Sequence, residues 1–392
     1  MIKNYGLVIL GRLSYPGNTA PSNRVHLYAK SLKNAGGFPF IINLHSTFTD
    51  KKKFGFLARN NEIPFYFAQK TPYKIHNIFK RNLLKPAGLY NTLIIINRLR
   101  RSNYLKVLFY NTTLSEELLL FPFLKLMGIK IIRECCEAPF YIKQNHKSVR
   151  VYNFFLKWKL KMYDNLIVIS DNLREFYKDK FPQKFMYQIP IIVDMERFKN
   201  RPILNSSGPK LITYIGFMGD NKDGIENLID AVFLLKKSFT NFLLQLIGTA
   251  SENELSLLQN KVKLLGLEKN VLFLGKKNTD EIPNFLSHSN ILVLARPNNN
   301  QAKAGFPTKL GEYLAAGKPV VITKTGEIPK YLQHKVSAYL AEPDDVCDFA
   351  EKLLDALTDQ NAEEIGHEGL KVAANNFDYK IYSAQLFNLI QN

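Results

Sequence analysis

Short apolar runs rich in β-branched and aromatic residues alternate with helical patterns along the chain, and this alternation constrains the fold more than any other feature. In the first half, the candidate strands are residues 7–10, 39–43, 105–110, 130–133 and 165–170. In the second half, they are residues 210–215, 242–247, 271–274, 291–294 and 319–323. Helical patterns lie between them at residues 23–34, 226–237, 252–265, 280–288 and 309–316. This alternation predicts an α/β fold in which helices cover both faces of parallel sheets.

The series of strands and helices occurs twice, which predicts two domains. A chain of 392 residues is also long for one core, since domains average about 150 residues. Pro190, Pro202 and the polar residues 205–209 interrupt the pattern between the two series. We therefore expect domains at residues 1–190 and 191–377, with a closing helix at residues 378–392 that packs back on the first domain. Two such sheets leave a crevice at the carboxyl ends of their strands, where open α/β sheets bind ligands.

The positive charge of the chain lies in its first half. Lys and Arg total 53 against 34 Asp and Glu, which gives a net charge of +19. Residues 1–190 hold 31 basic and 10 acidic residues, net +21, whereas residues 191–392 hold 22 and 24, net −2. This asymmetry indicates that the first domain meets an anionic partner.

The cysteines and the apolar segments indicate the compartment. Cys135, Cys136 and Cys347 have neither the spacing of a disulfide framework nor that of a zinc site, which favours a reducing environment. The apolar run at residues 6–10 is too short for a signal sequence. A membrane-spanning helix needs about 18 apolar residues, and Pro122 interrupts the most apolar segment. We therefore expect a cytoplasmic protein that does not span a membrane.

Residues 296–323 hold the most informative pattern. After the strand that precedes them, Gly305 allows a ligand to approach the backbone closely. Pro307 and Thr308 begin a predicted helix, whose free N–H groups together with Lys309 favour an anion. Neither a glycine-rich dinucleotide fingerprint nor a Walker A lysine motif is present in the sequence. The phosphates of a nucleotide would therefore be held by a helix N-terminus and single lysines.

This stretch closely resembles the donor-site signature of retaining glycosyltransferases of family four, the bacterial polysaccharide type. Glu312 matches the second of the two glutamates in that signature, and the resemblance implies that it binds the ribose of the nucleotide. Ala304 occupies the position of the first glutamate, so the resemblance does not identify the sugar. It also implies the GT-B fold, in which two Rossmann-like domains have parallel sheets that face each other across a cleft.

The resemblance covers nearly the whole chain and implies further donor contacts. Residues 214–224 are similar to the family's first donor-domain strand and loop, where a basic residue before a glycine binds the diphosphate. Lys222 is the matching residue, displaced by one because Asp223 precedes Gly224. Residues 192–198 are similar to the family's interdomain link. The candidate donor-binding residues are Gly17, Asn18, Gly216, Lys222, Gly275, Arg296, Gly305, Phe306, Pro307, Thr308, Lys309 and Glu312.

Two segments of the first half are candidates for the reacting end of the site. In the loop after the first strand, Gly17 and Asn18 can direct N–H groups to a phosphate. Arg24, at the start of the following helix, can pair with an anionic substrate or acceptor. Glu134 and Glu137 follow a predicted strand end, where they can act in catalysis or simply pair with a nearby arginine. The candidate catalytic residues are Glu134, Glu137 and Lys222.

The expected chemistry uses protein charge and no metal or other cofactor. The sequence contains no Asp-x-Asp metal pair, so Lys222, Lys309 and the N–H groups near them are expected to neutralise the departing diphosphate. The substrate is expected to be a UDP- or GDP-linked sugar. The resemblance implies that the anomeric configuration is retained, and the sequence leaves open whether a covalent intermediate forms.

The basic first half is expected to face the acceptor and an anionic membrane surface. In residues 153–163, lysines alternate with apolar residues around the single tryptophan of the chain. The candidate residues for contact with the acceptor or the membrane are Lys157, Trp158, Lys159 and Lys161. Each cation near an anionic leaflet adds about 1 kcal/mol of binding. The alternative is a solvated basic surface whose helix packs inward. The family's acceptors are often polyprenyl-linked saccharides, so we expect a peripheral protein at the inner face of the plasma membrane.

Two other functions are compatible with parts of the sequence. Nucleic-acid binding would explain the charge of the first half, but no nucleic-acid motif is present and the donor signature would have no role. An inactive or purely sugar-binding GT-B protein would explain Ala304. A turnover assay with nucleotide sugars separates the enzyme from the binder.

Overall fold

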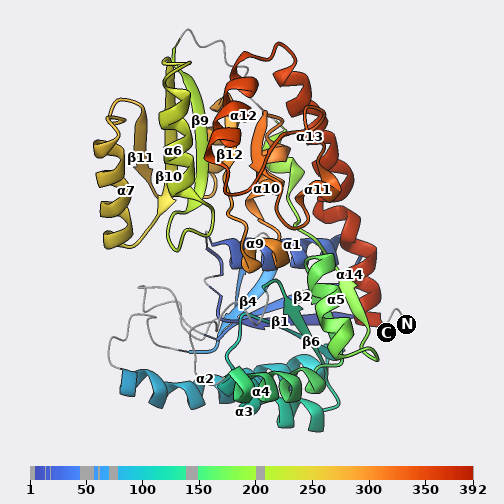
Figure 1. Cartoon of the computed structure of the whole chain (residues 1–392). Helices are drawn as coiled ribbons and strands as arrows, with labels where there is room; N and C mark the ends of the chain where they lie inside the picture. Colours follow the sequence, from blue (N-terminus) through green and yellow to red (C-terminus); the bar gives the residue numbers. More distant parts are fainter. Residues whose placement is uncertain are drawn as a thin grey trace. The chain divides into compact units, whose positions relative to one another are not determined.

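The computed structural model describes residues 5–13, 15–17, 19–44, 57–60, 62–69, 78–137, 149–199 and 208–391. The chain divides into two compact units (Figure 1). Unit 1 comprises Met1–Ile189 and Tyr379–Asn392, and unit 2 comprises Pro190–Asp378. Each unit contains one predominantly parallel sheet with helices packed on it. The predicted α/β class with two parallel sheets is therefore confirmed.

The sheet of unit 1 has the strand order β3-β4-β2-β1-β5-β6-β7-β8. Its strands are β1 (Gly6–Gly11), β2 (Phe38–Asn43), β3 (Leu57–Asn60), β4 (Ile63–Phe67), β5 (Lys106–Tyr110), β6 (Lys130–Cys135), β7 (Asn165–Val168) and β8 (Met186–Gln188). Only the pair β3–β4 is antiparallel among these neighbours. The central strands β1 and β5 are buried along their whole length, which accounts for their continuous apolar sequences. Sequence patterns did not predict β3, β4 or β8, which are short strands at or beside the edges of the sheet.

The helices of unit 1 lie on both faces of its sheet. They are α1 (Ala20–Asn34), α2 (Ile78–Arg100), α3 (Leu114–Leu126), α4 (Val149–Met162), α5 (Asp171–Lys180) and α14 (Ser383–Gln391). Figure 1 shows α2, α3 and α4 together on one face and α1 on the other. Helix α1 begins three residues before its predicted start because the Thr19 hydroxyl accepts a hydrogen bond from the Ser22 N–H and Pro21 fits the first turn.

The last residues of the chain pack on unit 1. Helix α14 and the short 3₁₀ helix η4 (Tyr379–Tyr382) both contact α1. The Ser31 hydroxyl donates to the Tyr379 carbonyl (2.7 Å), and the Lys106 ammonium donates to the Leu389 carbonyl (2.8 Å). These buried bonds attach the end of the chain to the first unit, which explains why unit 1 is built from two separate segments of sequence.

The sheet of unit 2 is wholly parallel and has the order β11-β10-β9-β12-β13-β14. Its strands are β9 (Lys210–Phe217), β10 (Phe242–Thr249), β11 (Val271–Gly275), β12 (Ile291–Leu294), β13 (Val320–Thr323) and β14 (Tyr339–Ala341). Its helices are α6 (Ile225–Leu235), α7 (Glu252–Leu264), α8 (Ile282–His288), α9 (Asn300–Ala304), α10 (Lys309–Ala315), α11 (Ile328–Tyr331), α12 (Val346–Thr358) and α13 (Ala362–Asn376), with the 3₁₀ helix η3 (Met195–Phe198). Strands β12 and β13 are completely buried. Strands β9 and β12 are parallel neighbours, so the segments that follow them leave the sheet at the same edge. The candidate site lies at this edge.

Within the parts of the chain that the structure describes, no helix is both long and apolar enough to cross a membrane.

Candidate functional site

The candidate site of unit 2 is built from the segments that follow β9 and β12. After β12, the Arg296 carbonyl accepts a hydrogen bond from the Thr323 hydroxyl of β13 (2.8 Å). Asn299 then caps α9, because its side chain accepts from the Ala302 N–H (2.8 Å), and the helix closes at Gly305. The chain continues through residues 306–308 into α10. These hydrogen bonds hold the segment between β12 and α10 in a defined conformation.

A buried carboxylate lies between two cations at this edge of the sheet. Asp223 accepts hydrogen bonds from the Tyr214 hydroxyl (2.8 Å) and the Lys309 ammonium, and its other oxygen lies 3.7 Å from Arg296 Nε. Lys309 also donates to the Tyr214 hydroxyl oxygen (2.9 Å). Asp223 and Arg296 are almost completely buried. We call Tyr214, Asp223, Arg296 and Lys309 the Asp223 cluster.

The electrostatics of the Asp223 cluster follow from burial and from the opposite charges. Burial alone would raise the pKa of Asp223, but Lys309 and Arg296 outweigh it, so that this pKa lies below its usual value. For Lys309 burial is the larger effect: it lowers the pKa, and the attraction of Asp223 only partly offsets it. Lys222 also lowers the pKa of Lys309. The cations that the sequence predicted near the donor phosphates thus influence one another, and Asp223 balances part of their charge.

Two glycines allow this packing. A Cβ atom at Gly216 would overlap Lys309 Nζ and would lie 2.6 Å from the Tyr214 hydroxyl. Gly224 has a φ of +69°, and a Cβ atom there would overlap the Ala295 carbonyl at the end of β12. Gly216 therefore leaves room for the Lys309 side chain, and Gly224 lets the chain turn into α6 directly beside β12.

Glu312 has a partner that the sequence did not predict. Its carboxylate accepts a hydrogen bond from Arg197 Nη1 (2.5 Å), and Arg197 Nη2 donates to the Thr279 carbonyl (2.7 Å). Both charged side chains are about one quarter exposed. Arg197 thus holds one oxygen of Glu312 at the surface of unit 2. The signal for Arg197 was present, because it lies in the segment 192–198 that resembles the interdomain link.

The other predicted donor residues of unit 2 differ in how far they are exposed. Lys222 is partly exposed on the turn before α6, and Gly275 ends β11 with a φ of +65°. The side chain of Phe306, in contrast, is buried and packs on Tyr331 (ring centroids 5.4 Å apart) and Phe377 (5.6 Å). The ring of Phe306 therefore belongs to the core of unit 2, which leaves only its backbone for the predicted contact with the donor. Pro307 is buried and Thr308 is half-buried.

In unit 1, Arg24 and Glu134 pair with each other in the interior. Arg24 Nε donates to Glu134 Oε1 (2.9 Å), Arg24 Nη2 donates to the Ile189 carbonyl (2.8 Å), and the Tyr28 hydroxyl donates to Glu134 (3.0 Å). Both charged side chains are at most 2% exposed. Burial raises the pKa of Glu134, and Arg24 partly offsets this effect. For Glu134 the alternative of pairing with a nearby arginine therefore holds, and the predicted pairing of Arg24 with an anionic substrate is corrected, since its charge is paired with Glu134.

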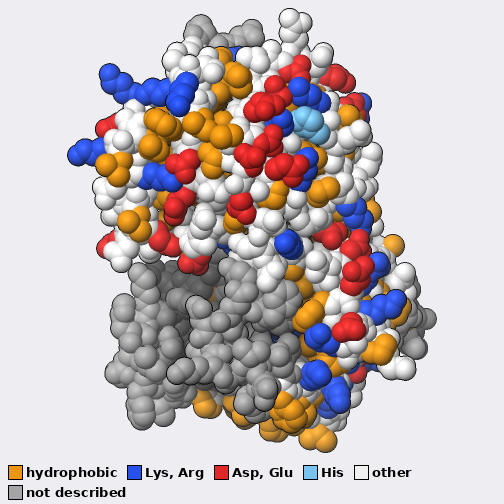
Figure 2. Space-filling model, viewed as in Figure 1, with side chains coloured by type: hydrophobic (Ala, Val, Ile, Leu, Met, Phe, Trp, Pro, Cys, Tyr) orange, Lys and Arg blue, Asp and Glu red, His pale blue; other side chains and the backbone are white. Residues whose placement is uncertain are grey.

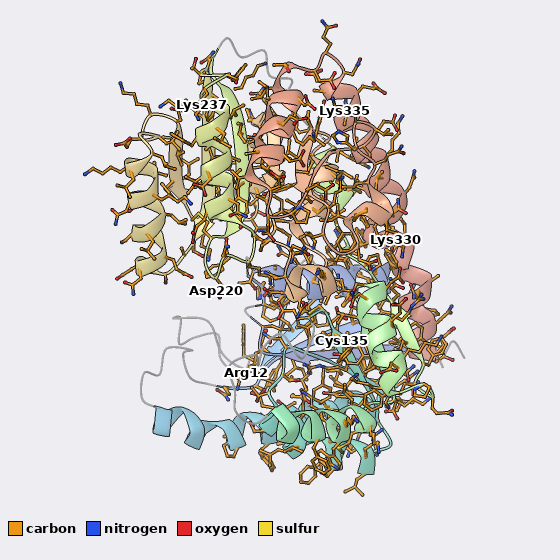
Figure 3. All side chains as sticks on the ribbon, viewed as in Figure 1. Arg12, Cys135, Asp220, Lys237, Lys330 and Lys335 are labelled. Atoms are coloured by element: carbon orange, nitrogen blue, oxygen red, sulfur yellow. The ribbon has the colours of Figure 1, made fainter. Side chains whose placement is uncertain are left out.

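The remaining predicted residues of unit 1 differ in their exposure. Gly17 is described and half-buried, Asn18 lies outside the described residues, and Glu137 is exposed after β6. Cys135 lies inside unit 1 (Figure 3), and burial raises the pKa of its thiol to about 12. All three cysteines are present as free thiols.

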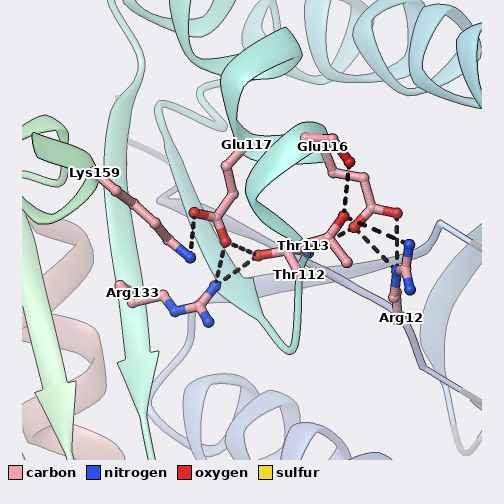
Figure 4. Close-up of polar contacts among 8 residues, drawn as sticks. Arg12, Thr112, Thr113, Glu116, Glu117, Arg133 and Lys159 are labelled. Carbon is pink, nitrogen blue, oxygen red and sulfur yellow. Dashed lines mark hydrogen bonds and ion pairs between the residues drawn. The ribbon is translucent and has the colours of Figure 1, made fainter. Parts of the chain in front are cut away.

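A second buried carboxylate, Glu117, binds a lysine that the sequence had assigned to a membrane surface. Glu117 lies in the first turn of α3, is fully buried and contacts Arg133 Nη1 and Lys159 Nζ, each at 2.7 Å (Figure 4). The Thr112 hydroxyl donates to the same carboxylate (2.5 Å). The side chain of Lys159 is only 14% exposed. The prediction that Lys159 faces a membrane is therefore wrong, because the inner side of α4 carries this lysine towards Glu117.

The described residues contain no group of three His, Cys, Asp or Glu side chains arranged to hold a metal ion. The polar groups around Asp223 are instead the two cations Lys309 and Arg296 and the Tyr214 hydroxyl. Such a set is chemically suited to an anion and unsuited to a divalent cation.

Comparison with solved structures identifies the fold. The chain is similar to Alr3699/HepE of Anabaena, solved in complex with UDP and glucose, with a TM-score of 0.73, 15% identity, and coverage of 99% of this chain and 100% of that one. At this identity the likeness concerns the fold alone. The two units together have the GT-B fold, as predicted.

Comparison with family models identifies the second unit. Residues 196–371, which lie within unit 2, match the family described as "Glycosyl transferases group 1". N-acetyl-alpha-D-glucosaminyl L-malate synthase of Bacillus anthracis is 24% identical over 216 residues, covering 53% of this chain and 54% of the relative. The putative colanic acid biosynthesis glycosyltransferase WcaL of Escherichia coli is 27% identical over 205 residues, covering 51% and 49%. The chain thus spans about half the length of these relatives.

Proposed function

We propose that this protein is a retaining glycosyltransferase that moves a sugar from a UDP- or GDP-linked donor to a saccharide or polyprenyl-linked acceptor. The observation that carries the proposal is the Asp223 cluster, which gathers Lys309 and Arg296 at the carboxyl ends of β9 and β12 in a group 1 glycosyltransferase domain. Open α/β sheets bind nucleotides at this edge. The similar HepE structure was solved with UDP and glucose, which supports a nucleotide diphosphate as the leaving group.

The proposed role of the cations is to stabilise charge that develops on the departing diphosphate. Breaking the bond between the anomeric carbon and the diphosphate leaves negative charge on the phosphate oxygens, and fixed cations stabilise that charge without reorganisation. Lys222 is exposed enough to approach the phosphates. Lys309 and Arg296 act from the interior of the unit, where Asp223 holds them in place. The protein thus supplies positive charge that other enzymes obtain from a metal ion.

Glu312 is proposed to bind the ribose of the donor. One of its carboxylate oxygens is held by Arg197, which orients the other for a hydrogen bond from a ribose hydroxyl. A carboxylate that is fixed before the ligand arrives loses less entropy on binding. The pair Arg197–Glu312 therefore gives the ribose a preformed acceptor group.

The proposed setting is the synthesis of cell-envelope polysaccharide, such as O-antigen, capsule or exopolysaccharide, at the inner face of the plasma membrane. The relative WcaL is named for colanic acid biosynthesis. The strongly basic first half of the chain, net +21 over residues 1–190, suits an acceptor whose lipid carrier lies in an anionic membrane.

The test is nucleotide release from a panel of UDP-, GDP- and ADP-sugars, with and without a short polyprenyl-linked acceptor mimic. We expect acceptor-dependent release from one nucleotide class. Glu312→Gln and Lys222→Ala should each lower turnover at least about tenfold, since each removes a charge-assisted contact. The matched controls are Glu268→Gln and Lys263→Ala, which change exposed residues away from the Asp223 cluster and from the Arg197–Glu312 pair. Unchanged turnover in both site variants would refute the site assignment.

The same assay separates a second candidate, a sugar-binding protein without transferase activity. Ala304 is buried at the position where the resemblance places a glutamate, which removes a carboxylate contact to the sugar. Saturable binding of a nucleotide sugar by calorimetry, with no release of nucleotide under any acceptor condition, would support the binder and overturn the proposed transferase.

A further inference from the structure

Helix α3 exposes a continuous apolar stripe. Leu118, Leu119, Phe123 and Leu126 are spaced so that they share one side of the helix, and Leu126 is 84% exposed. The opposite side of α3 is buried through Leu120, Phe121 and Leu124. Large apolar side chains that are scattered singly need no explanation, but four on one helix side form a patch of the kind that marks an interaction site.

Helix α4 continues this surface with a mixed apolar and basic stripe. Phe154, Lys157, Trp158 and Lys161 follow the spacing i, i+3, i+4 and i+7, which places them on one side of the helix, and all four are exposed. The inner side of α4 is defined by Leu160, which is buried, and by Lys159, which binds Glu117.

The exposed sides of the two helices belong to one surface. Lys159 of α4 binds Glu117 of α3, and Tyr163 after α4 packs on Phe121 of α3 with ring centroids 4.9 Å apart. Both helices lie on the same face of the unit 1 sheet (Figure 1). Figure 2 shows apolar side chains gathered with Lys and Arg along the lower edge of the molecule, where Figure 1 places α3 and α4. We call this surface, formed by Leu118, Leu119, Phe123, Leu126, Phe154, Lys157, Trp158 and Lys161, the α3–α4 face.

The charges around the α3–α4 face are almost all positive. Residues 63–115 contain no Asp or Glu. The two glutamates of α3 are buried and used internally: Glu116 pairs with Arg12, and Glu117 pairs with Arg133 and Lys159. Asp164 is engaged by Lys125 through both of its oxygens. At the end of α2, Arg100 donates to the Met127 carbonyl just after α3 (2.7 Å), which holds this basic helix end beside the apolar stripe.

Resting on the membrane setting of the proposed function, we propose that the α3–α4 face docks unit 1 on an anionic lipid bilayer, with the leucine and aromatic side chains in the headgroup–acyl boundary and the cations at the lipid phosphates. Leu, Phe and Trp interleaved with Lys on one helix side are typical of helices that lie in a membrane interface. Long lysine side chains can keep their charge in the headgroup region while their stems cover apolar surface. Two observations carry the proposal: an apolar stripe with no covering element in the described part of unit 1, and a surrounding charge that is predominantly positive.

The same observations disfavour other occupants. A second copy of this face would bring like charges together, which opposes self-association. A nucleic acid would match the charge but would leave the aliphatic side chains of Leu118, Leu119 and Leu126 in water, since its phosphates offer no apolar surface. A bilayer satisfies both the charge and the apolar stripe.

Trp158 makes the test specific, because it is the single tryptophan of the chain and lies on the α3–α4 face. The full chain is mixed with vesicles of phosphatidylcholine alone and with vesicles of phosphatidylcholine and phosphatidylglycerol in equal parts. We expect a blue shift of Trp158 emission and quenching by lipids brominated near the headgroup, with the anionic vesicles only. We expect flotation with the same vesicles, and loss of flotation at high salt.

Two double variants with matched controls complete the test. Phe123→Ser with Leu126→Ser should lower the partition coefficient into vesicles at least about tenfold, because each substitution removes an apolar side chain that would enter the bilayer. Lys157→Gln with Lys161→Gln should lower it about fivefold for each lysine. The controls are Leu257→Ser with Leu264→Ser on α7 and Lys263→Gln with Lys269→Gln, which alter similarly exposed residues of unit 2.

Three results would overturn the proposal. The first is equal recovery with neutral and anionic vesicles. The second is unchanged Trp158 emission in the presence of vesicles that float the protein. The third is a concentration-dependent dimer in sedimentation velocity that the Phe123→Ser and Leu126→Ser double variant abolishes, which would make the face a contact between copies of the chain. Nucleotide release is measured without vesicles, so failure of docking and failure of the proposed transferase activity are distinguishable.

Discussion

Replacing Asp223 with asparagine is expected to destabilise unit 2. Asp223 is buried between Lys309 and Arg296, and it accepts a hydrogen bond from the Tyr214 hydroxyl (2.8 Å). Asparagine has nearly the same shape, and its amide oxygen can still accept the bond from Tyr214. The substitution therefore removes the negative charge and little else, which leaves two buried cations facing each other.

The magnitude follows from the burial of the cluster. Removing one partner of a buried ion pair costs about 3–5 kcal/mol, because the other charge stays desolvated. Since the introduced asparagine would keep the Tyr214 bond, we expect the lower end of this range, about 3 kcal/mol in the free energy of unfolding of unit 2. In a unit of this size each kcal/mol shifts the melting midpoint by about 2–4 °C, so the expected shift is about 6–12 °C.

The loss of stability should depend on pH with a defined sign. In the native protein the pKa of Asp223 is lowered, so its contribution is present above the usual carboxyl pKa and is lost as the pH falls through the folded-state value. In the variant the pKa of Lys309, already lowered by burial, falls further. Lys309 of the folded variant then loses its proton at a lower pH than Lys309 of the unfolded chain. The stability of the variant therefore rises as the pH approaches the usual lysine pKa. The difference between the two proteins should therefore be largest near neutral pH.

Hydrogen exchange of peptides from β9 and α10 is the suitable assay, because Trp158 lies in unit 1 and does not report on unit 2. Asp220→Asn is the matched control: it neutralises an exposed aspartate on the same turn and should change the free energy of unfolding by less than about 0.5 kcal/mol. If Asp223→Asn at pH 7 costs no more than this control, the Asp223 cluster does not stabilise unit 2 and the reasoning fails.

Two further predictions concern the packing around Asp223 and around Glu117. Gly216→Ala should displace Lys309, because the added Cβ overlaps its ammonium group; we expect a cost of about 1–3 kcal/mol and weaker binding of the nucleotide sugar by calorimetry. Gly208→Ala, which meets no atom within 4 Å, is its control, and equal affinity in both variants would contradict the expectation. Glu117→Gln should destabilise unit 1 by about 3 kcal/mol, since Arg133 and Lys159 lose their shared counter-charge. Denaturant unfolding followed by Trp158 fluorescence measures this change, with exposed Glu137→Gln as the control; an unchanged midpoint would show that the buried pair adds nothing to stability.

Much of the fold could be predicted from local sequence patterns. The continuous apolar runs of β1, β5, β12 and β13 match strands that are buried on both sides, which is why their positions were predictable. Strands β3, β4 and β8, at or beside the edges of their sheet, were missed, because short strands bury few residues and leave a weak pattern. The extent of α1 was also set by its capping residue, Thr19, which a hydrophobic pattern does not reveal.

The candidate site was predicted in its position and less well in its contacts. Lys309, Arg296 and Gly216 were named from the sequence, and the structure brings them together around Asp223. Asp223 itself was noted only because it shifts Lys222 by one position from the place expected in the motif. An acidic residue in a turn expected to be basic could have indicated that it pairs with a nearby cation. Phe306 was assigned to the donor, but its ring packs in the core. Spacing identifies which segments approach a site and does not determine which way each side chain turns.

The sequence by itself determined the two α/β units, the segment that leaves β12 and the basic charge of the first half, because each follows from periodicity, turn residues or composition along the chain. Only the tertiary structure decided how the charges are used. Arg24 and Glu134, Lys159 and Glu117, and Lys309 and Asp223 are pairs separated by between 42 and 110 residues of sequence. The free energy of a buried charge depends on its partner within a few ångströms, and that partner is set by how strands and helices pack. The basic residues left outside these pairs, beside the apolar stripe of α3, are those that we propose for contact with a membrane surface.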